Sequence, residues 1–363
     1  MASDTMPNRG TVELSIILPF YNSARWLPSC LKQLCKQRLS SLEILAIDDG
    51  STDDSAKIAE DFAKKDPRIR LLGIEHAGPG IARNIGLENA RGKYIGFVDS
   101  DDLAEVSMFE TMVATASSAN ADAVVCDYFL LRPMPFGKVY TQRANSTHLV
   151  GQNGHIAYPA ESRFNPFTLN PAPWNKIFHR DLLERIGFRF SEERHYEDVP
   201  FVYTCLMRAR RVCLIDQPLY HHRYRWPGSV SAAKDERRFD IFAVLAQLEN
   251  TVRSTPEISH QLDNFLAFRT NTLLYHLSLV HSSMRDAFWQ HIQKTLHGGF
   301  DRQQSANLSC PQTLVLRIRM INAIGQTLLF LAGKRAAALM RAHRALLSWF
   351  TAPSQTDVSK KSG

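Results

Sequence analysis

The sequence lacks the glycine-rich loops that mark two large classes of nucleotide-binding enzyme. No GxGxxG follows the first predicted strand, and no GxxxxGKS/T occurs anywhere in the 363 residues. The first motif carries the pyrophosphate of a dinucleotide, and the second cradles the phosphates of a nucleoside triphosphate. The sequence therefore predicts neither a dinucleotide-dependent oxidoreductase nor a P-loop enzyme.

Paired cysteines and long apolar runs are also missing. The six cysteines are scattered without a CxxC pair, which indicates reduced thiols and a cytoplasmic protein. No uncharged apolar run reaches the roughly 18 residues that a membrane span needs. The first residues, MASDTMPNRGTVE, contain no apolar segment, so we expect no signal peptide and a flexible start over residues 1–11.

Acidic residues are absent from Arg302 to Thr356. The seven basic residues of this segment account for the whole net charge of +7, so we expect no general nucleic-acid binding. Two stretches within Leu314–Phe350 are apolar on one side and basic on the other, which fits peripheral attachment to an anionic membrane face. The alternative is that their apolar sides pack on the rest of the protein. Residues 351–363 are predicted to be disordered.

Apolar runs alternate with helical patterns over the first part of the chain. The predicted buried strands are Leu14–Pro19, Leu42–Ile47, Arg68–Ile74, Tyr94–Val98 and Ala123–Leu130. The helical patterns between them predict an α/β fold, with a mainly parallel sheet sandwiched by helices. The loops at 20–22, 48–54 and 99–102 should then lie on one rim of the sheet, where such folds bind ligands.

The loop Asp99-Ser100-Asp101-Asp102 is the strongest candidate for a metal site. Asp99 and Asp101 follow a buried strand and are two residues apart, so an ideal strand would point them to the same side. Oxygen ligands of this kind suit Mg²⁺ or Mn²⁺ bound to a substrate's phosphates. The alternative is an acidic turn in which one Asp caps the next helix.

Three later stretches carry further predictions. The first two have two interpretations each, and the third is predicted to be helical. Glu197 and Asp198 precede an apolar helix predicted at Val199–Met207, whose N-terminal dipole could simply attract carboxylates or keep a general base ionised. Trp174 lies in the proline-rich stretch NPFTLNPAPWNKIF and is either a core residue or a ligand platform. From Glu236 to Leu296 the pattern predicts two or three helices.

Six motifs between Leu14 and Ser231 occur together: LSIILPFYN, EILAIDDGSTDDS, ARNIGLENARGKYIGFVDSDD, WNKIF, YEDVPF and YRWPGSVS. As an ordered set they resemble the family 2 glycosyltransferases, which are inverting nucleotide-sugar enzymes of the Rossmann-like GT-A fold. The resemblance implies a catalytic domain over 12–231, with a donor-nucleotide half at 12–130 and an acceptor half at 131–231. A helical region over 232–350 would follow it.

The resemblance also implies roles for single residues. The implied donor-binding residues are Pro19, Tyr21, Asn22, Asp49, Arg83 and Asp99. Tyr21 would lie beside the base and Asp49 would hydrogen-bond it, whereas Asp99 and Asp101 would serve the ribose and the diphosphate-bound Mn²⁺ or Mg²⁺. His222 would complete the metal shell, or it is a packing or surface residue.

On the acceptor side, the implied lining residues are Trp174, Asn175, Lys176 and Arg225. Asp198 matches the catalytic base and is preceded by Glu197. The sequence departs from the family pattern at Ala24, where a glutamate is frequent, but that glutamate takes no part in the chemistry.

The implied function is metal-dependent transfer of a sugar, with inversion, from a nucleotide-diphosphate donor such as a UDP-sugar. The acceptor would be a hydroxyl of a glycan or lipid-linked glycan in bacterial surface-polysaccharide synthesis, at the cytoplasmic membrane face. One alternative is a non-catalytic scaffold or membrane adaptor. Another is a phosphatase of the haloacid dehalogenase type, whose DxD also ends a strand. That motif usually follows the first strand, and the phosphatase interpretation leaves Glu197 and Asp198 without a role.

Overall fold

The structure is a computed structural model that describes residues 12–133, 139–143, 155–159, 164–187, 189–192, 195–224 and 234–297. The predictions for residues 1–11, Leu314–Phe350 and 351–363 lie outside the described residues. The chain divides into two compact units, Met1–Thr270 and Asn271–Gly363. The first unit thus extends past residue 231, where the sequence predicts the end of the catalytic domain.

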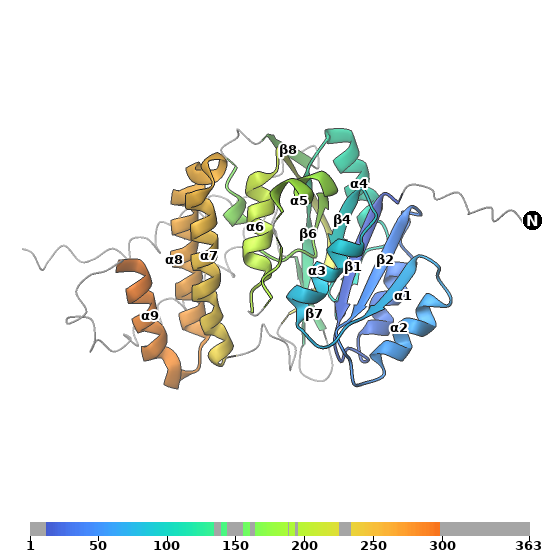
Figure 1. The fold of residues 1–363 in the computed structure, drawn as a ribbon, viewed down its shortest axis with the longest axis horizontal. Coiled ribbons are helices and arrows are strands. Elements are labelled where there is room, and N and C mark those ends of the chain that lie inside the picture. The colour runs from blue at the N-terminus through green and yellow to red at the C-terminus, as the bar shows by residue number, and fades with distance from the viewer. Residues whose placement is uncertain are drawn as a thin grey trace, which may run out of the picture. The chain divides into compact units, whose positions relative to one another are not determined.

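Ten strands of the first unit form one sheet (Figure 1). They are β1 (Leu14–Phe20), β2 (Leu42–Asp48), β3 (Ile69–Gly73), β4 (Tyr94–Phe97), β5 (Leu103–Ala104), β6 (Ala123–Pro133), β7 (Val139–Arg143), β8 (His155–Pro159), β9 (Lys176–His179) and β10 (Arg211–Arg223). Eight of them follow the order β3-β2-β1-β4-β9-β6-β10-β5, while β7 pairs with β6 and β8 pairs with β10.

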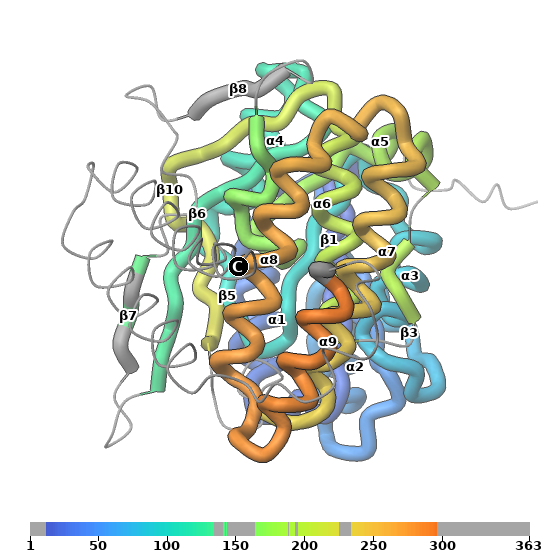
Figure 2. Tube along the Cα trace, turned by 90° about the vertical axis from the view of Figure 1, so that its left-hand side faces the viewer, coloured from blue at the N-terminus to red at the C-terminus, as the bar shows by residue number. Residues whose placement is uncertain are grey.

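The two halves of this sheet differ in strand direction. Strands β3, β2, β1 and β4 are all parallel, as the sequence predicts. The second half is mixed, because β9 enters antiparallel between β4 and β6. Beyond it, β10 runs parallel to β6 and carries the short antiparallel β5 on its other side (Figure 2). The segment after β6 contributes the antiparallel strands β7 and β8.

Six α-helices cover the two faces of the sheet. They are α1 (Leu27–Cys35), α2 (Ser55–Ala63), α3 (Pro79–Asn89), α4 (Met108–Ala119), α5 (Arg180–Ile186) and α6 (Asp198–Arg208). One face packs against α1, α2 and α4, and α3, α5 and α6 lie along the other (Figure 1).

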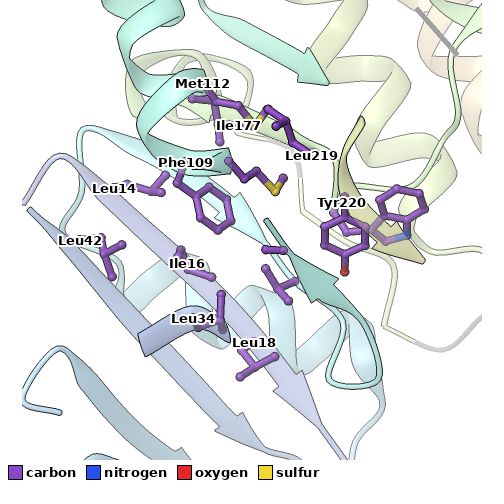
Figure 3. Close-up of a cluster of buried hydrophobic side chains, with 14 of the residues drawn as sticks. Leu14, Ile16, Leu18, Leu34, Leu42, Phe109, Met112, Ile177, Leu219 and Tyr220 are labelled. Atoms are coloured by element: carbon purple, nitrogen blue, oxygen red, sulfur yellow. The ribbon is translucent and has the colours of Figure 1, made fainter. Parts of the chain in front are cut away.

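Alternate residues of β1 show how the sheet serves both cores. Leu14, Ile16 and Leu18 point toward α1 and α4, where they join Leu34 and Phe109 in one buried cluster (Figure 3). The intervening Ile17 faces α3, and this contact is so close that a Cβ on Gly86 would lie 2.4 Å from Ile17 Cγ2. Both faces of β1 are therefore buried, as in a central strand, which explains why its sequence is apolar except for the buried Ser15.

The parallel register sets the rim on which the predicted loops meet. Phe20 is paired with Asp48, so the chain leaves β1 and β2 at the same level. Strand β4 ends beside them, with Phe97 paired to Ile17. The prediction that the three loops share one rim is confirmed.

Helices continue after the sheet. Helix α7 (Asp240–Ser254) packs against α6 within the first unit, and α8 (Leu262–Leu279) begins there. The second unit holds the end of α8 and helix α9 (Arg285–His297). Three α-helices thus occupy the segment for which two or three helices were predicted. Among the described residues, none of the helices combines the length and apolar character that crossing a membrane requires.

Candidate active site

The loop after β1 is tied to the loop after β2 through Asn22. Its side-chain oxygen accepts a hydrogen bond from Thr52 N at 2.8 Å, and Asn22 N donates to Ser51 Oγ at 3.1 Å. Asn22 adopts a left-handed conformation with φ 45°, which asparagine tolerates better than most residues. Ser23 extends the connection to the acidic loop, since its Oγ lies 2.8 Å from Ser100 Oγ. Asn22, predicted at the donor, thus also holds the rim together.

Asp49 is buried beneath this rim and organises the segment that follows β3. Its carboxylate accepts hydrogen bonds from Ala77 N at 2.8 Å and Gly78 N at 3.0 Å. His76 Nδ1 lies 3.0 Å from Asp49 Oδ2, and the His76 ring stacks on Tyr21 with centroids 4.0 Å apart. The two residues predicted to meet the donor base, Tyr21 and Asp49, are therefore brought together, with His76 between them.

The acidic loop after β4 is held by residues at the end of β10. Asp102 is fully buried: its Oδ1 accepts from Arg223 N at 2.7 Å, and its Oδ2 lies 2.9 Å from His222 Nδ1. Arg223 also donates from its guanidinium to the backbone carbonyl of Asp101. Asp102 thereby anchors the loop, whereas no ion pair joins the carboxylate of Asp101 to any residue that the structure describes.

Crowding of carboxylates changes the acid–base properties of this loop. Burial raises the pKa of Asp101 to about 7, and Asp102 and Asp99 add to the effect. Burial lowers the pKa of His222, but Asp102, Asp99 and Asp101 outweigh it and raise that pKa to about 9. His222 is then protonated at neutral pH and serves as a counter-charge to the loop.

The three metal ligands predicted from the sequence do not form a closed cage. Among the described residues, no three His, Cys, Asp or Glu side chains are grouped so that they could hold an ion by themselves. Arg83 binds one oxygen of Asp99, and Asp102 binds Nδ1 of His222, whose pKa of about 9 leaves Nε2 protonated at neutral pH as long as no metal is bound. The groups that remain available to a metal are the Asp101 carboxylate and the Asp99 oxygen that Arg83 does not bind. Mg²⁺ commonly binds one or two such carboxylates together with substrate phosphates.

Arg83 connects the acidic loop to the start of α6. Its Nη2 donates to Asp99 Oδ1 at 3.1 Å and its Nη1 donates to Glu197 Oε1 at 2.5 Å. Burial lowers the pKa of Arg83, but Asp99, Glu197 and Asp198 raise it above the ordinary arginine value. The sequence predicted a donor-binding arginine; the structure instead places Arg83 among protein carboxylates, as a buried bridge between the two predicted parts of the site.

The approach of α3 to the α6 segment requires glycine at position 80. A Cβ on Gly80 would lie 2.2 Å from the backbone oxygen of Ser191 and 3.3 Å from Glu197 Cγ. Since Gly80 and Arg83 lie one turn apart on α3, the close approach brings Arg83 within reach of Glu197.

Asp198 is the first residue of α6, directly after Glu197. Burial raises the pKa of Asp198 to about 7; Glu197 and Asp99 raise it further, and Arg83 opposes them. The expectation that the helix N-terminus keeps this carboxylate ionised is corrected, because burial and neighbouring carboxylates outweigh the dipole. A pKa near neutrality is nevertheless suited to a group that takes up a proton during a reaction.

The Trp-Asn-Lys motif lies inside the protein. Lys176 and Asn175 are fully buried, and Lys176 Nζ donates to the backbone oxygens of Asn170 and Ala172 and to Asn175 Oδ1. Burial lowers the pKa of Lys176 to about 7. The prediction that these side chains line the acceptor side is therefore corrected, because they frame the loop before β9 and reach no surface.

Trp174 belongs to the same buried frame. Its indole stacks on Tyr220 and on His222, with centroid distances of 4.6 Å and 4.8 Å. Of the two interpretations of Trp174, the structure supports the core residue. Its indole orients the His222 ring by stacking on it. Pro19 is likewise buried, within β1, and so shapes the strand end rather than meeting a ligand. Arg225, predicted at the acceptor, lies outside the described residues.

Sequence reasoning missed three residues that organise the site. Asp102 was treated as part of an acidic turn, although both of its carboxylate oxygens bind the end of β10. Tyr220 accepts a hydrogen bond from Asp99 N at 3.1 Å through its hydroxyl, a contact between residues 121 positions apart. His76 could have been noticed, because it lies two residues after the end of the third predicted strand and therefore on the same rim.

Comparisons with known proteins agree with this arrangement. The family model described as Glycosyl transferase family 2 matches residues 15–187. The uncharacterized glycosyltransferase EpsJ of Bacillus subtilis (strain 168) is 34% identical over 58% of this chain and 60% of EpsJ. EpsH of the same organism, which also carries a glycosyltransferase name, is 30% identical over 72% of this chain and 76% of EpsH. The chain thus spans less than two thirds of the length of EpsJ.

Among solved structures, TarS 1–349 of S. aureus in complex with UDP-GlcNAc superimposes with a TM-score of 0.59. The similarity covers 78% of this chain and 88% of the TarS chain at 21% sequence identity. At that identity the likeness concerns the fold, which is of the GT-A, Rossmann-like type with a mixed sheet and flanking helices.

Proposed function

The chain belongs to glycosyl transferase family 2 and is a glycosyltransferase, and from this premise we propose that it transfers a sugar from a UDP-linked donor to a hydroxyl group with inversion of the anomeric carbon. The observation that carries the proposal is the Arg83 bridge. It joins Asp99 of the proposed donor loop to Glu197 beside the proposed base, so both parts of a transfer reaction belong to one polar network.

The donor half of the proposal is supported by the rim of the parallel strands. Tyr21 and His76 form an exposed pair of stacked rings above Asp49, which suits a planar base. Asp99 and Asp101 lie at the end of the neighbouring strand, on the side where a diphosphate attached to that base would extend. TarS, which shares the fold, was solved with UDP-GlcNAc, and this favours a UDP-sugar for the present chain as well.

A divalent cation, Mn²⁺ or Mg²⁺, fits the acidic loop as a partner of the donor. The residues that would hold it are Asp101 and Asp99, because Asp101 forms no ion pair with any described residue and the crowded carboxylates of this loop raise its pKa to about 7. When bound, such an ion neutralises the charge that develops on a diphosphate leaving group. His222, protonated and held by Asp102, contributes positive charge to the same loop.

Asp198 is the proposed general base. In a single displacement the acceptor hydroxyl must lose its proton as its oxygen attacks the anomeric carbon, so an α-linked donor gives a β-linkage. The pKa of about 7 lets Asp198 accept that proton near neutral pH. Glu197 is bound to Arg83, and we assign it the role of positioning Asp198 rather than of a second base.

The acceptor is proposed to be a glycan or lipid-linked glycan used for bacterial surface polysaccharide. Such acceptors are membrane-bound, and the basic, amphipathic segment Leu314–Phe350 would hold the enzyme at the cytoplasmic face. Vesicle co-sedimentation of the full chain tests this part: binding to anionic but not to neutral vesicles is expected. Equal binding to both, or none to either, contradicts it.

The proposed reaction is tested by incubating the protein with a panel of nucleotide sugars and Mn²⁺ or Mg²⁺. Slow release of UDP from one UDP-sugar is expected even without acceptor, and EDTA should stop it. Asp198→Asn serves as the matched control for contaminating hydrolases, because it removes the basic oxygen and keeps the shape of the side chain. UDP release that persists in this variant, or no release from any donor, contradicts the proposal.

A further inference from the structure

The hydrogen-bonding state of His76 is determined by its surroundings. His76 Nδ1 lies 3.1 Å from the backbone oxygen of Asp49 and 3.0 Å from its Oδ2. A carbonyl oxygen and a carboxylate oxygen both accept hydrogen bonds and neither donates. Nδ1 must therefore carry a hydrogen, and in the neutral ring Nε2 then presents a lone pair.

His76, rather than Asp49, is the polar group that an approaching ligand meets. The Asp49 side chain is 4% exposed, and its two oxygens already accept from Ala77 N, Gly78 N and His76 Nδ1. The His76 side chain is 55% exposed. No described residue forms a hydrogen bond with His76 Nε2. In this arrangement His76, rather than the buried Asp49 carboxylate, offers the more exposed acceptor to a donor base.

The position of His76 is also fixed from two other directions. Gly50 has φ +72°, and a Cβ at this residue would lie 2.8 Å from His76 N, so the two backbones touch. On the other side the Tyr21 ring stacks on the imidazole at 4.0 Å with an interplanar angle of 23°. A ring held in this way can impose a direction on a hydrogen bond, because little freedom remains to be lost.

We propose that His76 reads the nucleobase of the donor: Nε2 accepts the N3–H of uracil, and Asp49 is a positioning residue that fixes the tautomer of His76. This inference rests on the proposed function and goes beyond it, since it assigns base selection to His76. Uracil has a hydrogen on N3, whereas cytosine has a lone pair there. The lone pair of Nε2 would thus attract UDP and repel CDP.

The test compares the dissociation constants of UDP and CDP, measured by isothermal titration at pH 8 with Mn²⁺ present. The wild-type protein should bind UDP at least about tenfold more tightly than CDP, the effect of roughly one hydrogen bond. His76→Phe keeps a ring for stacking on Tyr21 but has no acceptor, so its UDP-to-CDP ratio should fall to within about twofold of unity. His76→Ala should give the same ratio with weaker binding of both. Glu75→Ala, an exposed neighbour, should keep the wild-type ratio.

Asp49→Asn tests the positioning role separately. An amide nitrogen in place of Oδ2 faces Gly78 N and His76 Nδ1 with hydrogens of its own, so the side chain no longer accepts from Nδ1 and no longer helps to fix the tautomer of His76. The UDP-to-CDP ratio should then fall below that of the wild type. A merely structural role of Asp49 would weaken both nucleotides by the same factor.

The inference and the function on which it rests fail in different ways. Should the wild type bind UDP tenfold better than CDP while His76→Phe keeps that ratio, another residue reads the base and the inference is wrong, although the function stands. Should the wild type bind neither UDP nor a UDP-sugar, the proposed function itself fails, and the inference with it.

Discussion

The parallel and the mixed halves of the sheet place their polar motif residues at different depths. In the parallel half, Tyr21 is 42% exposed, and its stacking partner His76 also faces solvent. In the mixed half, Asn175 and Lys176 are fully buried, and Trp174 is nearly so. A motif residue in the first half can thus meet a ligand, whereas the Trp-Asn-Lys motif can only support the residues that do.

The difference follows from strand direction. Parallel strands covered by helices on both faces are mostly apolar, and the few polar side chains within them pair with one another, as Ser15 and Glu43 do at 2.6 Å. Polar residues that can meet a ligand are then found in the loops beyond the strand ends. In the mixed half, β9 enters the centre of the sheet antiparallel, and the Trp-Asn-Lys motif forms its beginning. Polar groups at that position must be satisfied internally, as the three hydrogen bonds of Lys176 Nζ show.

The largest effect is expected at the exposed end of the parallel half, for Asp101→Asn. Divalent-dependent UDP binding and turnover should be lost, because the carboxylate that has no ion-pair partner among the described residues is removed. Stability should not fall. The folded-state pKa of about 7 lies above the ordinary 3.8, so the ionised group destabilises the fold above pH 7 and its loss relieves this. Thermal unfolding at pH 8 should show an equal or higher Tm, and near-normal activity in Mn²⁺ would contradict the metal assignment.

A second prediction concerns Asp198, where the two halves meet. Asp198→Asn should lower kcat by about 10²-fold or more, with UDP affinity nearly unchanged, because the donor is bound by the other loops. For the wild type, kcat/KM should fall as pH drops below about 7, since protonation removes the base. Turnover assays and UDP titrations on Asp198→Asn and Glu197→Gln check this. If Glu197→Gln were inactive while Asp198→Asn had normal turnover, the general base would be Glu197.

Lys176→Met tests the buried frame of the mixed half. It should lower the free energy of unfolding by about 2–4 kcal/mol, because three buried oxygens lose their donor. Activity per folded molecule should change by less than about threefold. The pKa of Lys176 is lowered from 10.5 to about 7, so between these values the unfolded chain binds more protons and wild-type stability should rise with pH.

Urea unfolding at pH 7 and pH 9 measures both effects of Lys176→Met. The variant should lack the wild-type rise in stability between these pH values. The exposed Lys57→Met is the matched control and should stay within about 0.5 kcal/mol of the wild type. A Lys176→Met protein that is stable but inactive would place this lysine in contact with the reaction after all.

The smallest effect is expected for the rim connector, Asn22→Ala. It removes the acceptor for Thr52 N and places alanine at φ 45°, which together should lower the free energy of unfolding by about 1–2 kcal/mol. Asn22→Gly restores the backbone freedom without the acceptor and separates the two causes. UDP affinity, measured beside stability, should fall only severalfold. A complete loss of UDP binding in both variants would mean that Asn22 contacts the donor directly.

Much of the parallel half could be predicted from the sequence because its signals are local. A largely apolar run such as Leu14–Leu18 indicates a central strand, and parallel strands bring their carboxyl ends to one edge. The positions of Asp49, Asp99 and Asp101 on a single rim follow from these two facts. The helix that begins at Asp198 was likewise visible as an apolar segment after two carboxylates.

Tertiary structure alone decided which charges meet and how deep each group lies. Arg83 carries no sequence signal for its partners, because Glu197 is 114 positions away and the contact depends on the close approach that Gly80 permits. Lys176 and Asn175 occur in a polar-looking motif, and only the entry of β9 into the sheet buries them. The pKa of Asp198 is raised by the burial of its own side chain, by the adjacent Glu197 and by Asp99 from a distant segment. Sequence patterns report local preference, whereas desolvation and charge pairing depend on long-range contacts that exist only in the fold.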